Sequence, residues 1–440
     1  MFTLTQHFTR MLLRATAIGA ACCLSTWAIA KEQPLQKTPI TLNAADVLPK
    51  AMLTGEGYSI NRKVTNDGFQ NTYSLKTDYG NFSITGNQAL RARIQEIRAT
   101  KALEELEQSD AFKDAVKDTA SGMVEGGKAL VTSPVETSKG AAKGVGRWLG
   151  NVGRSVTSND PHQENVLKVA LGHDAVKRAY AIEMGVDPYT DFEPFQTQLG
   201  QVARASSAGG LIMSVGADVA SSGTVAGTVV TVVSVAGMKD ILKDEPPSTL
   251  SRINREKLEK MGVGKTQIEA LLKNYNYSPA DMTLMVEALK RMGKIKGREL
   301  FVTYATAAPD KVIARYMRQH AEMLANYISN VEGGDIVSIA AEAWLITRSG
   351  KLVGAIPIDY LAWTAEVDGA ERAASAGAAK HNVKGKELLI EGQVSPAAGK
   401  ALEARGWKVS EKVRLAAQKS GKPASKPSVS PAGTGSKVVR

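Results

Sequence analysis

Histidine and serine are the residue types that most often carry catalysis, and here their spacing matches no common catalytic motif. After residue 30 the histidines are His162, His173, His320 and His381. No two lie four residues apart, as a helical zinc-binding pair requires. Neither a G-x-S-x-G elbow nor an S-x-x-K pair occurs. The sequence therefore names no reaction, although a catalytic group assembled from distant positions stays open.

His320 is the one weak candidate for a catalytic residue. It belongs to a helical stripe of apolar and aromatic residues that runs from Tyr316 to Tyr327. A histidine in such a stripe is more often a hydrogen-bonded core residue, so we expect a structural role. The alternative is a hydrolase with a non-local site that includes His320. A cavity lined by His320 and a buried carboxylate would favour that alternative.

Two further motifs suggest a ligand and are better explained by local structure. The acidic run 187–193 lacks the sixth-position glycine and twelfth-position glutamate of a calcium loop, so we expect no metal site. The run 262–266, GVGKT, resembles the end of a phosphate-binding loop, but Glu259 stands where that loop requires glycine. Gly262 ending one helix and Gly264 capping the next explains these residues, and no cofactor is expected.

The first thirty residues, MFTLTQHFTRMLLRATAIGAACCLSTWAIA, predict a secretory signal peptide. Arg10 and Arg14 supply a positive start, and the 16 uncharged residues 15–30 are fewer than the roughly 20 of a spanning helix. We expect an exported protein, periplasmic or attached to the cell envelope, with the signal cleaved after Ala30. The predicted cleavage site consists of Ala28, Ala30 and Lys31.

Removing the predicted signal leaves 410 residues without cysteine, because Cys22 and Cys23 both lie inside it. An exported chain of this kind has neither disulfides nor a thiol nucleophile. Lipid attachment at one of the two cysteines is an alternative, but Gly19 and Ala20 stand where a lipoprotein signal usually has leucine.

The positive charge of the chain is concentrated at its C-terminal end. The formal net charge is +11, of which the signal contributes +2 and residues 400–440 contribute +8, so the body is near +1. The segment 417–440 is rich in Lys, Ser, Pro and Gly, which predicts a disordered basic tail. We expect partners among anionic envelope surfaces or proteins, and no nucleic acid.

Residues 205–238 form an unusual stretch of small and apolar residues in which Asp218 is the only charge. Two arms flank a Ser-Ser-Gly turn at Gly223, and we expect a helical hairpin in the protein core. The alternatives are a membrane-inserting hairpin and a pair of strands. Asp218 at the bilayer centre would cost roughly 2.5–3.5 kcal/mol, which favours the core. The candidate membrane residues are Asp218, Gly223 and Gly227.

Aromatic residues are sparse, at 5% of the chain, yet three of them lie close together in the sequence: Trp344, Tyr360 and Trp363. The simplest explanation is the core of a small hairpin. The alternative is an exposed platform that binds a glycan or a partner peptide.

The pattern of elements predicts an α+β fold that is mainly helical. Alternating residues and the turns at Gly68 and Gly80 predict an N-terminal antiparallel meander of three strands over 58–85, the first of which is the run YSINRKV. Later signals predict helices starting at Ser278, Pro309 and Ser395, and a C-terminal hairpin plus a βαβ unit. The expected segments are the signal (1–30), the meander with an amphipathic helix and a Gly-rich stretch (31–157), a helical region (158–334), an α/β unit (335–416) and the tail (417–440).

Three runs carry a resemblance to exported bacterial proteins: VTNDGFQNTYSLKTDYGNF, ALVTSPVETSKGAAKGVGR and ALEARGW. The chain resembles a family of such proteins that has no assigned activity. The resemblance implies export and supplies neither site residues nor a mechanism. Together with the missing reaction motifs, it makes a non-enzymatic binding or structural protein of the cell envelope the leading functional hypothesis.

Overall fold

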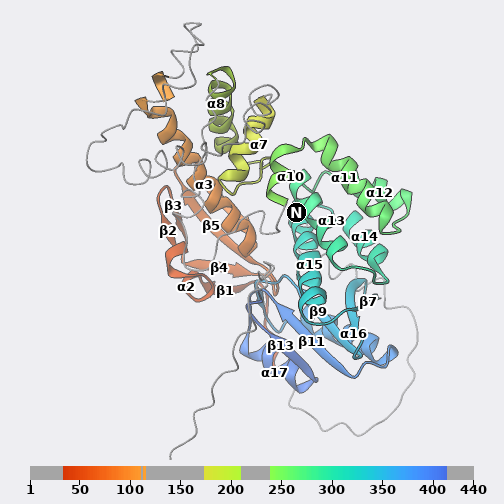
Figure 1. The fold of residues 1–440 in the computed structure, drawn as a ribbon. Helices are drawn as coiled ribbons and strands as arrows, with labels where there is room; N and C mark the ends of the chain where they lie inside the picture. Colours follow the sequence, from red (N-terminus) through yellow and green to blue (C-terminus); the bar gives the residue numbers. More distant parts are fainter. Residues whose placement is uncertain (1–32, 111, 115–172, 210–237, 414–440) are drawn as a thin grey trace, which may run out of the picture.

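The computed structural model describes residues 33–110, 112–114, 173–209 and 238–413 (Figure 1). It confirms an α+β fold with an antiparallel sheet near the N-terminus. A second sheet of mixed direction lies near the C-terminus, and helices fill the chain between the two (Figure 1).

The N-terminal sheet has six strands rather than the three expected. The predicted first strand is split at Asn61, whose side chain accepts a hydrogen bond from the N–H of Lys63 at 2.9 Å. Both halves pair with β5 on one side, in the strand order β1-β4-β5-β3-β2, and β6 pairs with the other side of β5. The strands are β1 (Ile40–Asn43), β2 (Thr54–Gly55), β3 (Tyr58–Ile60), β4 (Lys63–Asn66), β5 (Asn71–Thr77) and β6 (Gly80–Thr85).

Helix α3 (Asn87–Gln108) follows β6 directly and packs against this sheet. Its apolar stripe, which includes Leu90, Ile94 and Ile97, is buried together with Tyr73 and Leu75 of β5. This buried stripe is what makes the segment a stable helix, since its opposite face is charged. The other elements of this part are α2 (Ala44–Val47), the 3-10 helix η1 (Lys50–Met52), α7 (His173–Glu183) and α8 (Glu193–Gly209).

The predicted cap at Ser278 is confirmed, because its hydroxyl accepts a hydrogen bond from the N–H of Asp281 at 3.0 Å. The helix expected to start at Pro309 begins two residues later, at Lys311, because the Asp310 carboxylate is its N-cap and accepts from Val312 and Ile313 at 2.9 Å. Gly262, at φ +83°, ends α11, and Gly264 is the N-cap of α12. The helices are α10 (Met238–Asp244), α11 (Pro247–Lys260), α12 (Lys265–Leu272), α13 (Pro279–Arg291), α14 (Arg298–Thr306) and α15 (Lys311–Asn330).

Five of the C-terminal strands form one sheet in the order β13-β11-β9-β8-β7, and β10 and β12 form a separate parallel pair. Strand β8 runs antiparallel to its two neighbours, β7 and β9. Strands β9, β11 and β13 run parallel to one another and are joined by two helices. Because β9 belongs to both arrangements, the hairpin and the strand–helix–strand unit share one sheet. The elements are β7 (Gly334–Ile339), β8 (Glu342–Thr347), β9 (Lys351–Ile356), β10 (Tyr360–Leu361), α16 (Ala365–Lys380), β11 (Gly385–Ile390), β12 (Gln393–Val394), α17 (Pro396–Ala404) and β13 (Trp407–Ser410).

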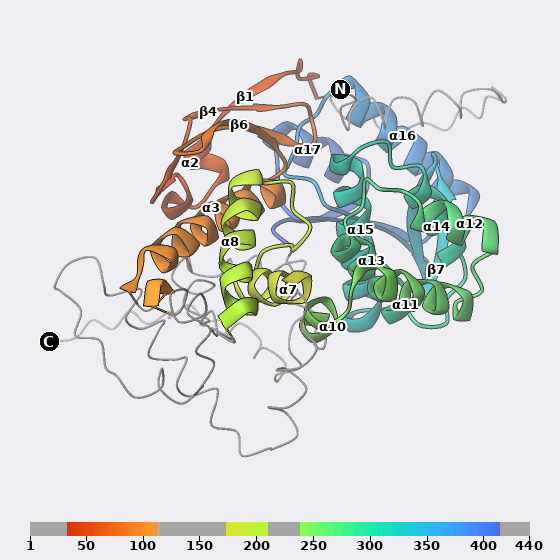
Figure 2. The same ribbon diagram turned by 90° about the horizontal axis from the view of Figure 1, so that it is seen from above.

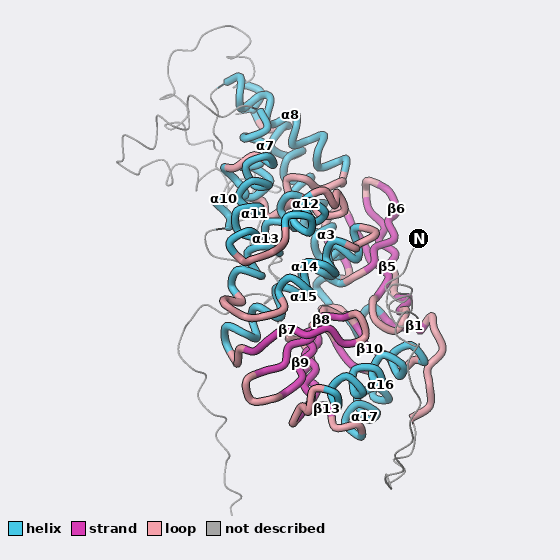
Figure 3. Tube along the Cα trace, turned by 90° about the vertical axis from the view of Figure 1, so that its right-hand side faces the viewer, coloured by secondary structure: helices cyan, strands magenta, loops and turns pink. Residues whose placement is uncertain are grey.

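The hydrophobic cores divide the chain differently from the segments expected from sequence. The largest core joins helices α11–α15 to the mixed sheet, so an expected boundary at residues 334 and 335 lies inside one core. A second core joins the N-terminal sheet to α3, α7 and α8. Figure 2 shows the sheet and α3 beside the helices of the larger core, and Figure 3 shows α10–α14 above the mixed sheet. We call these two parts the N-terminal unit (residues 33–110, 112–114 and 173–205) and the C-terminal unit (residues 247–413).

The glycine at the start of α14 tests how closely the helical layer packs on the mixed sheet. Gly297 has φ +84°, and an added Cβ would lie 1.9 Å from the carbonyl oxygen of Ile336 in β7. We expect Gly297→Ala to lower the free energy of unfolding by about 2 kcal/mol or more, from the positive φ and the clash together.

Gly293→Ala is the matched control in urea denaturation. Gly293 also has a positive φ, +74°, but an added Cβ would have no atom within 4 Å. It should lose only the cost of the positive φ, about 1–2 kcal/mol. Equal losses in the two variants would contradict the close approach of α14 to β7.

Candidate functional site

The most distinctive polar site of the described chain is a buried carboxylate between the two units. Asp359 lies between β9 and β10, is 6% exposed, and points to the start of α3. Its oxygens accept hydrogen bonds from the N–H of Asn71 at 2.9 Å and from the N–H of Asn87 at 3.0 and 3.1 Å. Because the N-cap residue Gly86 has no side chain, Asp359 takes the place of a capping residue from 272 positions away.

Amide side chains complete this buried site. Asn66 donates to the Asn71 side chain at 2.9 Å and to the carbonyl of Tyr360 at 3.2 Å. The Tyr73 hydroxyl donates to Asn87 Oδ1 at 2.5 Å. Nearby, Gln70 donates to the carbonyl of Pro357 at 2.9 Å. These bonds tie β4, β5 and α3 of the N-terminal unit to the segment that follows β9.

A second carboxylate meets the next turn of α3. Glu391 follows β11 directly and accepts hydrogen bonds from Gln88 at 2.6 Å and from Arg91 at 3.2 Å. Asp359 and Glu391 thus both follow parallel strands, at the edge where α/β proteins commonly bind ligands. Here the positive end of α3 occupies that edge, and its helix dipole favours the two negative charges.

The sequence reasoning missed both carboxylates, although a signal for them exists. Asp359 comes three residues after the end of β9, in the run AIPIDY, and Glu391 directly follows β11, in the run LLIEG. Acidic residues at the carboxyl ends of neighbouring parallel strands are expected to meet in space. The sequence does not show that β9 and β11 are neighbours, so the meeting of the two acidic residues could be recognised only from the fold.

Burial sets the electrostatics of the site. Removal from water raises the pKa of Asp359 to about 7, against the effect of the N–H groups of Asn71 and Asn87, which favour the charged form. Burial likewise raises the pKa of Glu391, against the effect of Arg91. Two strongly buried carboxyls with raised pKa values therefore lie at one junction, and their protonation is linked to folding.

The acidic run 187–193, expected to be turn chemistry, also joins the two units. The Asp187 carboxylate accepts from the N–H of Tyr189 at 2.9 Å, as an aspartate turn does, and from the Ser278 hydroxyl at 2.6 Å. Asp191 forms an ion pair of 2.6 Å with Lys311 of α15. Burial raises the pKa of Asp187 to about 6.

A small cavity opens beside Asp359, between the start of α3 and one face of α15. Its volume is about 20 Å³, and a single water needs roughly 10–15 Å³ on this measure, so one water or one ion of similar size fits. The cavity is lined by Gln70, Thr85, Gly86, Asn87, Gln88, Ala89, Val312, Arg315, Tyr316, Gln319 and Asp359.

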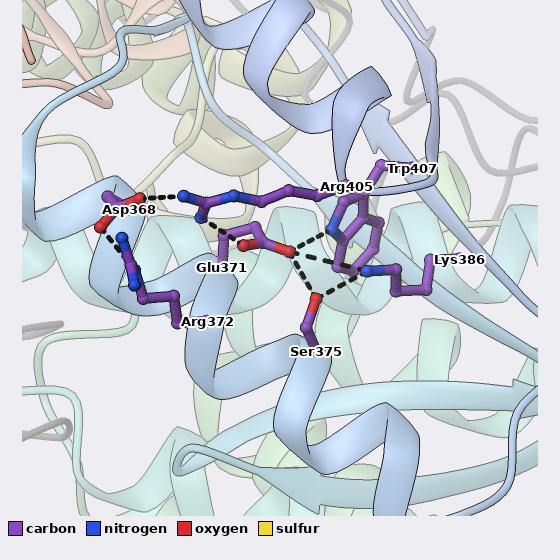
Figure 4. A network of polar contacts seen from close by, with 7 residues as sticks. All are labelled: Asp368, Glu371, Arg372, Ser375, Lys386, Arg405 and Trp407. Carbon is purple, nitrogen blue, oxygen red and sulfur yellow. Dashed lines mark hydrogen bonds and ion pairs between the residues drawn. The ribbon is translucent and has the colours of Figure 1, made fainter. Parts of the chain in front are cut away.

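A second polar network holds α16 against the mixed sheet (Figure 4). Glu371 of α16 accepts hydrogen bonds from the Trp407 indole at 2.8 Å and from Arg405 at 2.5 Å. Lys386 of β11 donates to Ser375 at 2.6 Å, and Ser375 in turn donates to Glu371. Burial raises the pKa of Glu371, but the bonds from Ser375, Trp407 and Arg405 outweigh it and hold the pKa below its usual value.

The same network also reaches β11 through a lysine. Lys386 donates to Ser375 at 2.6 Å and lies 3.6 Å from Glu371, and burial lowers the pKa of this lysine against the effect of Glu371. Arg405 also donates to Asp368 at 2.5 Å, and Arg372 pairs with the same carboxylate at 2.8 Å (Figure 4). The network therefore joins α16, β11 and β13.

His320 is placed inside α15, 1% exposed, with its ring at 5.3 Å from the ring of Phe301 and 5.8 Å from that of Tyr316. Neither ring nitrogen has a hydrogen-bond partner among the described residues. Burial lowers its pKa to about 3, so the ring is neutral. His320 does not line the cavity, and no hydrogen bond joins it to a carboxylate in the described part of the chain.

The three aromatic residues of the predicted binding patch lie in different environments. Trp344 of β8 is buried against Trp407, with ring centres 5.8 Å apart, and donates to the carbonyl of Ile339 at 3.2 Å. Trp363 is 1% exposed beneath the guanidinium of Arg405. Tyr360 of β10 is half-buried, so it alone presents part of its side chain to solvent.

The remaining predicted sites lie outside the described residues: the cleavage residues Ala28, Ala30 and Lys31, and the hairpin residues Asp218, Gly223 and Gly227. Among the described helices, none combines the length and apolar composition needed to cross a bilayer. The described residues contain no group of three or more His, Cys, Asp or Glu side chains placed to hold a metal ion. No family model, no curated protein and no solved structure matches the chain.

The raised pKa of Asp359 predicts how stability depends on pH. Between about pH 4 and 7 the folded state holds a proton that the unfolded aspartate has released, so stability from this group is lost as pH rises. We expect the unfolding free energy of the wild type, minus that of Asp359→Asn, to fall across this range, by up to about 1.4 kcal/mol per pH unit. Buried acids that do not interact with Asp359 cancel in the difference, whereas Glu391 does interact with it. A flat difference in urea denaturation contradicts the prediction.

The network of Figure 4 predicts that substitutions at two residues of α16 lower the free energy of unfolding by very different amounts. Glu371→Ala removes the partner of Arg405 and Lys386, and we expect it to lower the free energy of unfolding by about 3 kcal/mol. Arg372→Ala removes a largely exposed ion pair and should cost less than about 1 kcal/mol. Thermal and urea unfolding of both variants provide the measurement. Similar losses for the two would show that Glu371 does not hold α16 in place.

Proposed function

We propose that the chain is an exported, non-enzymatic binding or structural protein of the cell envelope. The signal-like residues 1–30 and the resemblance to exported proteins support export. The basic segment 417–440 supports loose attachment to anionic surfaces. In this proposal the folded body carries the tail, and the tail makes the salt-sensitive contact.

The non-enzymatic part of the proposal rests on one observation: the carboxyl ends of the parallel strands β9 and β11 face α3. Asp359 and Glu391 stand where an α/β enzyme commonly holds its substrate, and both are bonded to α3. These carboxylates therefore hold the N-terminal unit to the C-terminal unit. A rigid body that joins two sheets through a helix suits presentation of a surface or a tail better than turnover of a substrate.

The tail gives the proposal a direct test with the processed chain, residues 31–440. We expect it to float with anionic phospholipid vesicles at an ionic strength of roughly 0.01 M and to be released at roughly 0.3 M. Deleting residues 417–440 should abolish flotation and leave the thermal midpoint unchanged, since the described cores end before this segment.

A chain whose tail lysines and arginines are replaced by glutamine is the matched control for length, and it should behave like the deletion. Export is checked by sequencing the N-terminus of the envelope fraction, where Lys31 should be the first residue. Flotation that is unchanged without the tail contradicts the attachment proposal, and an unprocessed cytoplasmic chain contradicts export.

A further inference from the structure

Two of the four backbone N–H groups in the first turn of α3 have no hydrogen-bond acceptor among the described residues. The N–H of Asn87 is bonded to Asp359, and the N–H of Leu90 is bonded to the carbonyl of Gly86 at 3.0 Å. For the N–H groups of Gln88 and Ala89, the described residues supply no acceptor. Both residues line the cavity, and the helix behind them is 22 residues long. The positive end of a long helix thus faces this space with two free donors.

The opposite wall supplies an independent observation. Gln319 of α15 lines the cavity, is only 6% exposed, and its amide makes no hydrogen bond to any described residue. The amide atoms of Gln319 stay accessible from the cavity, so an occupant bound there can take the place of the water that would otherwise satisfy them. The amide can donate through its NH₂ group to a negatively charged occupant.

Arg315, one turn before Gln319, adds a positive charge to the same wall. Arg315 lines the cavity, is half-buried, and is joined to no described residue by an ion pair or a hydrogen bond. Its charge acts at longer range on the carboxylates of Glu96, Asp187 and Asp191. A guanidinium without a close carboxylate beside two free N–H groups is a common anion-binding arrangement.

We propose that this cavity binds a small monovalent anion of the size of chloride. The N–H groups of Gln88 and Ala89 and the side chains of Arg315 and Gln319 supply the donors. The volume of about 20 Å³ holds one such ion, whereas a phosphate, a sulfate or a sugar exceeds it. The ion would complete the capping of α3 that Asp359 begins.

Asp359 sets the pH dependence of this site, because its carboxylate also lines the cavity and repels an anion when it is charged. The charged and titratable groups that act on Asp359 are Arg91 of α3, Tyr73 of β5 and Glu391 after β11. Arg315 faces it from α15 across the cavity. Anion binding should therefore strengthen as the pH falls through neutrality and Asp359 gains its proton.

Thermal unfolding of the full processed chain tests the proposal, with sodium chloride compared against sodium gluconate at equal ionic strength. Gluconate is too large for the cavity, so the midpoint should rise with chloride beyond its value in gluconate, and the excess should be larger below neutral pH. Arg315→Gln and Gln319→Leu should each lose the chloride-specific rise. Arg252→Gln, which removes an arginine 63% exposed on α11, should keep it.

Crystals soaked in sodium bromide give a readout that does not depend on the folding of any variant. The proposal predicts an anomalous peak in contact with the N–H groups of Gln88 and Ala89 in the wild-type protein. Equal thermal midpoints in chloride and gluconate, or a water in place of bromide, overturn it. A chloride-specific rise that survives Arg315→Gln and Gln319→Leu also overturns it.

Discussion

The structure depends on how the start of α3 is held. A helix begins with N–H groups that need acceptors, and the residue before α3 is a glycine, which offers no side-chain acceptor. Asp359, after β9, accepts from the N–H of Asn87 instead, and Glu391, after β11, accepts from the side chains of Gln88 and Arg91 in the same helix. Because those residues follow strands of the mixed sheet, the helix cannot be capped unless both units are folded and docked.

This arrangement is a compromise between desolvation and hydrogen bonding. Burying a carboxylate is costly, and the raised pKa of Asp359 expresses that cost. Two backbone N–H groups and the end of a long helix offset part of it, and removing the carboxylate would leave these donors unpaired. The same balance recurs at Asp187, which accepts from Ser278 across the junction. Buried acids therefore join the two units alongside an apolar cluster in which Ile182 of α7 packs with Leu250 and Leu284.

Local signals in the sequence predicted many of the helices and strands, but they could not predict how these elements pack against one another. The capping patterns at Ser278 and Ser395 predicted helix starts, because a cap depends on residues within one turn. The run YSINRKV was predicted as one strand, and nothing in its alternation reveals the break at Asn61. The partners of Asp359 lie 288 and 272 residues away, so no periodicity could indicate them. Nothing in the sequence singled out Gln319, and only the fold places it at a cavity.

The central claim is that the N-terminal and C-terminal units form one cooperative body through α3. Native-state hydrogen exchange, followed by mass spectrometry at increasing urea, tests it by comparing peptides that span β5 and β11. The account predicts the same opening free energy and the same urea dependence for both peptides, because neither unit stays folded without the other. Exchange of β5 at urea concentrations where β11 remains protected would contradict it.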